Sequence, residues 1–286
     1  MRMPAYRFTR RRRLLGVILL GACRSIVDPA LPHGAQAFAP PAVYRTWWTM
    51  TESCSGRTGS FDQVHWYRVP GVDELPSSGP KLVTGYWSLA SDQIVLAGNG
   101  QFDGGLVRHE MLHALLRSGG HPRAAFLGTC AGVVDCASDC VTDAGPPPAL
   151  DASALAVTED ELALSVSVAP AAPSMAIDDG FFTVTVSATN ARERPVVVSL
   201  RDSSRAILGQ WLQFHLQSAR GGISSGVNAI DASTVRFAPG ETKRQVFDFH
   251  IGNDIPSGAL PLGTWSVGGG LGLRNWVYDT VTLKQE

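Results

Sequence analysis

The chain has 286 residues, with 24 Lys or Arg, 25 Asp or Glu and 44% hydrophobic residues, so its formal net charge is −1. Six of the basic residues and none of the acidic ones precede Cys23, which leaves 18 basic against 25 acidic residues in the remainder. This balance excludes a basic surface of the kind that binds nucleic acid. The hydrophobic content is sufficient for a globular core, and the length suits one large domain or two smaller ones.

Residues 1–22 have the pattern of an export signal. Four arginines, Arg10–Arg13, precede an apolar run at 14–20 that is too short for an ordinary membrane span. The run ends in Leu20-Gly21-Ala22-Cys23, which resembles the lipobox of bacterial lipoproteins. That resemblance implies lipidation of Cys23 and an exported chain held in the cell envelope, at the outer membrane or facing the periplasm. Cleavage by an ordinary signal peptidase, without lipidation, is the alternative.

A proline-rich tether is expected at residues 23–42, followed by a compact domain at 43–145. Aromatic and β-branched residues predict several strands in that domain. These strands are expected at residues 44–51, 64–69, 82–88 and 93–96. In the second of them, His65 alternates with the apolar residues on both sides, so we expect a surface or packed side chain rather than a metal ligand.

The most informative stretch is His109-Glu110-Met111-Leu112-His113. Apolar residues surround it, Asp103 is expected to cap a helix there, and Ser118-Gly119-Gly120 is expected to end that helix. Positions i and i+4 lie on the same face of a helix, so the two histidines can bind one metal ion. The glutamate can then act as a general base on a water molecule bound to that ion. A chance match on an ordinary buried helix is the alternative.

This H-E-x-x-H arrangement resembles the zincin metallopeptidases, whose two histidines bind Zn²⁺. The resemblance implies an α+β fold for residues 43–145, with a small sheet and an active-site helix. It also implies an edge strand beside the cleft that pairs with extended peptide substrate, and residues 93–96 are the candidate for it. An ordinary strand inside the sheet is the alternative for that segment.

A catalytic zinc site commonly has a third protein ligand, and His121 is the nearest candidate. The two glycines before it allow the chain to turn back toward the helix. A surface position at the helix end is the alternative for this histidine, and three later carboxylates could replace it as a ligand, namely Asp135, Asp139 and Asp143. The metzincin subgroup has Gly and His where this chain has Leu116 and Gly119, so the chain departs from that extended motif.

Four cysteines follow Cys23 in the sequence: Cys54, Cys130, Cys136 and Cys140. In an exported chain, an even number predicts two disulfides, here with three possible pairings. We expect Cys54 to bond one of the other three, which would join the first predicted strand to the segment after the helix. Zinc binding by the three later cysteines is the alternative.

Gly145-Pro146-Pro147-Pro148 marks a change from helix to strand patterns, so residues 146–152 are interpreted as a linker between two domains. Short alternating segments in residues 153–286 predict an all-β antiparallel sandwich. Its strands are expected at residues 181–188, 195–200, 213–216, 234–237, 245–251, 264–267 and 277–283.

Two stretches of this second domain, 237–242 and 262–265, resemble immunoglobulin-like domains of the bacterial intracellular proteinase-inhibitor type. The resemblance implies an Ig-like fold for residues 153–286. His215 and His250 alternate with apolar residues, so we expect both side chains to face solvent rather than a metal.

These features favour a lipid-anchored zinc peptidase of the cell envelope. Zn²⁺ held by His109, His113 and His121 would activate a water molecule, and Glu110 would take its proton. The partners are then a peptide or protein substrate and, through the N-terminal lipid, a membrane, with no nucleic acid. The alternatives are a non-catalytic binding or scaffold lipoprotein with a structural or degenerate metal site, and a second domain that inhibits other proteases.

Overall fold

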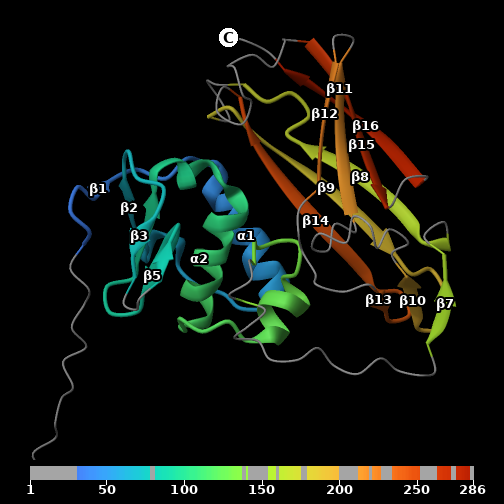
Figure 1. Cartoon of the computed structure of the whole chain (residues 1–286), viewed down its shortest axis with the longest axis horizontal. Helices are drawn as coiled ribbons and strands as arrows, with labels where there is room; N and C mark the ends of the chain where they lie inside the picture. The colour runs from blue at the N-terminus through green and yellow to red at the C-terminus, as the bar shows by residue number, and fades with distance from the viewer. Residues whose placement is uncertain are drawn as a thin grey trace, which may run out of the picture.

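The computed structural model (Figure 1) describes residues 31–77, 81–136, 140, 154–158, 161–174, 179–199, 212–218, 221–226, 234–251, 263–271 and 275–283. The described residues up to 140 are called the N-terminal half, and those from 154 onward the C-terminal half. The export signal, Cys23, the first part of the tether and the linker lie outside the described residues. Within the part of the chain that is described, no helix is long and apolar enough to cross a membrane.

A four-stranded sheet forms one layer of the N-terminal half, with the order β1-β2-β6-β5. The strands are β1 (Gln36–Ala37), β2 (His65–Val69), β6 (Gln93–Ala97) and β5 (Gly85–Ser88). β2 and β6 run parallel, whereas the outer pairs are antiparallel. A separate pair joins β3 (Leu75–Pro76) to β4 (Leu82–Val83), so the strand predicted at 82–88 divides into β4 and β5. β1 lies in the segment that was expected to be only a tether.

The segment 93–96 lies inside the sheet, so its prediction as an edge strand is wrong. β6 has β2 on one side and β5 on the other, and Ile94, Val95 and Leu96 are fully buried. An uninterrupted apolar run is typical of a strand covered on both faces. The edge strands of this sheet are β1 and β5, and β5 contacts the helix that carries the two histidines.

The strand predicted at 44–51 is also wrong, because these residues belong to helix α1 (Val43–Ser55). Its buried side chains recur at the spacing of one helical face. They are Tyr44, Trp47, Trp48 and Thr51. Aromatic and β-branched composition favoured a strand, but packing of this face against the core overrides that propensity. The helix ends at Gly56, whose φ of 64° is left-handed.

Helix α2 (Gly104–Leu116) carries the H-E-x-x-H stretch, as the sequence predicts. Asp103 caps it, since its Oδ1 accepts a hydrogen bond of 3.0 Å from the Leu106 N–H. The helix ends one residue before the predicted stop, because Arg117 itself adopts the left-handed conformation with φ 53°. Arg117 is fixed there by an ion pair with Asp92 and by its position 5.1 Å from the Trp87 ring centroid.

The C-terminal half contains strands and no α-helix within its described residues. Three sheets have the orders β14-β9-β8, β12-β11-β15-β16 and β13-β10-β7, and together they enclose one apolar core. The strands are β7 (Leu155–Val157), β8 (Ala163–Ala169), β9 (Phe181–Thr189), β10 (Val196–Ser199), β11 (Leu212–Ser218), β12 (Gly221–Gly226), β13 (Thr234–Phe237), β14 (Thr242–His250), β15 (Gly263–Leu271) and β16 (Asn275–Leu283).

Every strand that the sequence predicts in this half is present, and three further strands, β7, β8 and β12, were not predicted. The Gly-Gly-Ile-Ser-Ser-Gly sequence of β12 has few residues that favour strands. The expectation of a purely antiparallel arrangement is wrong, because β7 pairs with β10 in parallel. The chain as a whole thus combines helices and small sheets in its first half with strands in its second.

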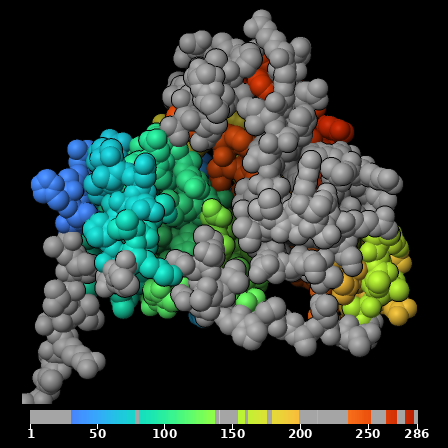
Figure 2. All heavy atoms as spheres, in the orientation of Figure 1, coloured from blue at the N-terminus to red at the C-terminus, as the bar shows by residue number. Residues whose placement is uncertain are grey.

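The two halves are in direct contact, and Figure 2 shows the blue-to-green half lying against the yellow-to-red one. The ring centroid of Phe181, the first residue of β9, lies 5.4 Å from that of Trp47. Phe181 belongs to the same apolar cluster as the buried side chains of α1 and α2. β14 contacts α2, so the helix that carries the histidines is covered by the C-terminal half on that side.

Candidate metal centre

Three histidines converge beside helix α2. His109 Nε2 lies 3.1 Å from His113 Nε2, one helical turn away, and 3.1 Å from His121 Nε2, which comes from the segment after the helix. All three donor atoms lie within 4.8 Å of one another. We call these residues the histidine cluster. The structure therefore brings together the three residues that the sequence singles out as metal ligands.

The two helical histidines are oriented by backbone carbonyls. His109 Nδ1 donates to Asp135 O at 2.6 Å, and His113 Nδ1 donates to Ser118 O at 2.7 Å. A carbonyl oxygen can only accept, so in the neutral ring the proton is on Nδ1 and the lone pair is on Nε2. Carbonyl partners of this kind commonly fix the ring orientation of metal-binding histidines.

Both rings are uncharged at neutral pH. Burial, with a smaller effect of the neighbouring His113 ring, lowers the pKa of His109 to about 3, and burial lowers the pKa of His113 to about 4. Unprotonated Nε2 atoms that face each other at 3.1 Å repel unless a cation lies between them. Two imidazoles on one tetrahedral zinc ion have nitrogens about 3.3 Å apart. The cluster therefore fits a metal ion of this size.

Phe126 forms an aromatic wall of the histidine cluster. Its ring centroid lies 4.9 Å from that of each of the three histidines, and the residue is fully buried. It belongs to the short helix η3 (Ala124–Thr129), which ends next to Cys130. The wall limits the movement of the imidazole rings and keeps water from that side of the donor atoms.

Two disulfides stabilise the segments that follow α2. Cys54 bonds Cys130 and Cys136 bonds Cys140, so the expectation for Cys54 is confirmed. Zinc binding by the three later cysteines is contradicted, because each sulfur is already bonded to another. The sulfurs of Cys136 and Cys140 lie within 4.8 Å of a ring nitrogen of His109, yet as a disulfide they offer no thiolate.

Replacement of Cys54 by Ser is expected to lower the free energy of unfolding by about 4 kcal/mol, because the bond closes a loop over 76 residues of sequence separation. Cys136 and Cys140 are only 4 positions apart in the sequence, so their disulfide closes a short loop. Replacement of both cysteines by Ser is expected to lower the free energy of unfolding by about 2 kcal/mol. Urea unfolding of the oxidised proteins measures both values. A larger loss for the short loop contradicts the expectation.

Glu110 lies next to His109 on α2, and its carboxyl faces the edge strand β5. The backbone N–H of Trp87 donates to this carboxylate, and a Cβ at Gly85 would lie 3.4 Å from Glu110 Oε1. Glu110 is only 4% exposed, and its Oε2 has no hydrogen-bond partner among the described residues. Burial raises its pKa to about 8, so this carboxyl can hold and release a proton near neutral pH.

Other residues considered in the sequence have different positions. Asp135 is not among the possible metal ligands; its backbone carbonyl instead accepts the hydrogen bond from His109 Nδ1. Asp139 and Asp143 lie outside the described residues. His65 is exposed, as predicted. His250 faces solvent only in part, because it is half-buried and its ring centroid lies 4.6 Å from that of Phe102, and it belongs to no group of possible metal ligands among the described residues. The side chain of His215 is outside what the structure describes.

The sequence analysis missed a buried ion pair between α2 and β14. Arg108, next to His109, is fully buried and forms an ion pair of 2.6 Å with Asp248 of β14. A charged residue on an otherwise apolar helix requires a buried partner, so the sequence gives a signal for Arg108. It gives none for Asp248, which lies 140 positions further along the chain.

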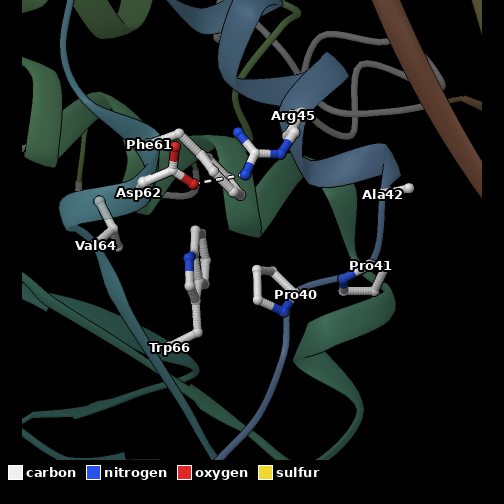
Figure 3. Close-up of a pocket in the computed structure, with 8 residues that line it drawn as sticks. All are labelled: Pro40, Pro41, Ala42, Arg45, Phe61, Asp62, Val64 and Trp66. Atoms are coloured by element: carbon white, nitrogen blue, oxygen red, sulfur yellow. Dashed lines mark hydrogen bonds and ion pairs between the residues drawn. The ribbon is translucent and has the colours of Figure 1, made fainter.

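Two cavities accompany these elements. One of about 700 Å³ lies between the halves, and among the residues that line it are Thr84, Asp135 and Asp248. A second, of about 290 Å³, is drawn in Figure 3, where Arg45 points toward Asp62 above Trp66. Its lining residues are Pro40, Pro41, Ala42, Arg45, Phe61, Asp62, Val64 and Trp66. It shares no residue with the histidine cluster, and we assign it no function.

No family model matches the sequence, and no curated protein resembles it at a significant level. Among solved structures, a β-glucosidase from Erythrobacter marinus aligns with a TM-score of 0.29 and 15% identity over 43% of this chain and 16% of its own. An alkylpurine DNA glycosylase from Pseudomonas fluorescens aligns with a TM-score of 0.26 and 10% identity over 42% and 30%. The chain thus spans a small part of these proteins, and likenesses at this level carry no functional argument.

Proposed function

We propose that the chain is a zinc-dependent peptidase that is exported and anchored in the cell envelope through lipidated Cys23. The observation that carries the proposal is the convergence of three imidazole Nε2 atoms next to a buried glutamate. Imidazole nitrogen suits zinc, and three histidines with a further open position are typical of catalytic zinc sites. His109, His113 and His121 would hold the ion, as in the zincin metallopeptidases that the H-E-x-x-H stretch resembles.

Zinc bound there would supply a Lewis acid that polarises a peptide carbonyl and activates water for attack. Glu110 accepts the proton that the attacking water loses, and transfers it to the nitrogen of the leaving amine. Its raised pKa suits both steps, because the carboxyl can change protonation state near neutral pH. The Trp87 N–H holds the carboxyl in place during this exchange.

An extended peptide would bind along β5, the edge strand next to Glu110. The cavity of about 700 Å³ begins at Thr84, directly before β5, and reaches Asp135 beside His109. Its lining includes none of the three histidines, and neither Glu110 nor a residue of β5. A peptide or protein substrate is consistent with an edge strand that is available for pairing.

Replacement of Glu110 by Gln is expected to lower the rate of peptide hydrolysis by about 10²- to 10⁴-fold, because the side chain keeps its shape but can no longer accept the proton. Bound zinc should remain at one ion per chain, since the three nitrogens are unchanged. Elemental analysis and digestion of a peptide library measure these two quantities. Replacement of the exposed Glu74 by Gln is the matched control and should change neither.

A non-catalytic envelope protein with a structural metal site is the second candidate, and the 4% exposure of Glu110 is the observation that favours it. In that case the wild-type chain binds zinc but cleaves no peptide of the library. Cleavage at equal rates by the wild type and the Glu110→Gln variant would show that Glu110 is not the base.

A further inference from the structure

The segment 131–135 connects the C-terminal half to the histidine cluster, and we call it the bridging segment. On one side, Gly132 O accepts a hydrogen bond of 2.8 Å from the Val246 N–H of β14. On the other, the Asp135 N–H donates to Gly105 O of α2 at 3.0 Å, and Asp135 O accepts from His109 Nδ1 at 2.6 Å. A displacement of β14 would therefore move the bridging segment and, with it, the carbonyl that orients His109.

Glycine allows the close approach on which this contact depends. A Cβ on Gly132 would collide with the carbonyl oxygen of Arg244 in β14, so no other residue fits there without a shift of the bridging segment. At the start of α2, a Cβ on Gly104 would collide with a side chain instead, the carboxylate of Asp248. At Gly132 the backbones of the two halves thus meet without an intervening side chain.

A buried ion pair holds the same elements together. Arg108 of α2 donates from Nε to Val133 O in the bridging segment, and its guanidinium pairs with Asp248 at 2.6 Å. The Asp248 carboxylate in turn accepts from Trp47 Nε1 at 3.0 Å and from Thr183 Oγ1 at 2.7 Å. Arg108 therefore contacts both β14 and the bridging segment, next to His109 in the sequence.

We propose that the C-terminal half is a positioning element of the metal centre. β14 fixes the bridging segment, and the Asp135 carbonyl then fixes the tautomer and the ring orientation of His109. Gly132 is a positioning residue, because it acts on the metal only through this carbonyl. The inference rests on the metal site of the proposed function, but it does not depend on peptide hydrolysis.

The test replaces Gly132 with Ala in the full chain and measures Zn²⁺ affinity by competition with a chelating dye. The affinity is expected to fall about 10- to 100-fold, as is typical when a partner of a metal-binding histidine is lost. A second measurement needs no metal: the nitrogen-bound proton at His109 Nδ1 should exchange slowly with water in the wild type and rapidly in the variant.

Gly240→Ala is the matched control, because Gly240 has a φ of 69°, close to the 76° of Gly132, and a Cβ there meets nothing within 4 Å. Both variants place alanine in the left-handed conformation, but only Gly132→Ala collides with β14. Zinc affinity and proton exchange in Gly240→Ala should match the wild type. Equal zinc affinity in all three proteins would overturn the proposal.

Asp248→Asn serves as a second variant if Gly132→Ala does not fold. It keeps the shape and one acceptor oxygen but weakens the pairing with Arg108, so zinc affinity is expected to fall several-fold. An unchanged affinity in a folded Asp248→Asn protein contradicts the proposal. A wild type that binds no zinc removes both this inference and the proposed function, whereas one that binds zinc without cleaving peptides removes only the latter.

Discussion

Replacement of His113 by Ala is expected to lower zinc affinity by roughly 10²- to 10³-fold and to abolish peptide hydrolysis. Zinc bound by four protein ligands is stabilised by about 10–16 kcal/mol, or about 3–4 kcal/mol per ligand. Each 1.4 kcal/mol corresponds to about a tenfold change in affinity. His113 is a suitable position for the test, because it is only 6% exposed and water cannot easily take the place of its ring.

The measurement is a zinc titration by dye competition, with the peptide-library assay at saturating zinc in parallel. His65→Ala is the control, since His65 is an exposed residue of β2 and should affect neither result. Zinc affinity within twofold of the wild type in a folded His113→Ala protein would mean that the ion binds elsewhere.

The candidate site could be predicted from the sequence because it depends on short-range geometry. The i, i+4 spacing fixes His109 and His113 relative to each other on any helix, and the cap at Asp103 marks where that helix begins. His121 follows within 8 residues of His113, so a single turn is sufficient to bring it back to the helix. Each of these features depends only on residues that are close in the sequence, so it can be predicted even where the surrounding fold is predicted wrongly.

The predictions that failed depended on tertiary packing. The residues of α1 are individually suited to strands, and only their burial on one face makes a helix the better arrangement. The position of 93–96 inside the sheet depends on which strand lies on each side of β6. The contact of α2 with β14 could not be predicted at all, since no pattern in a single sequence relates Arg108 to Asp248.

Replacement of Asp248 by Ala is expected to lower the free energy of unfolding by about 3–5 kcal/mol, because it leaves a buried guanidinium without its counter-charge. The side chains of Arg108 and Asp248 are 0% and 3% exposed, so water cannot substitute for the lost carboxylate. Trp47 and Thr183 also lose their acceptor. Urea unfolding, followed by the fluorescence of the tryptophans in α1, measures the effect.

Asp62→Ala provides the comparison, because its partner Arg45 is 62% exposed and Asp62 itself 73%, so that surface ion pair should contribute at most about 1 kcal/mol. The double variant Arg108→Met, Asp248→Leu removes both charges and should recover most of the lost free energy of unfolding. A deficit of about 1–2 kcal/mol should remain, because the donors of Trp47 and Thr183 still have no acceptor. Recovery of this kind attributes the cost of Asp248→Ala to the unpaired charge. If the double variant is instead as unstable as the single one, the shape of the contact between α2 and β14, rather than its charges, holds the two halves together.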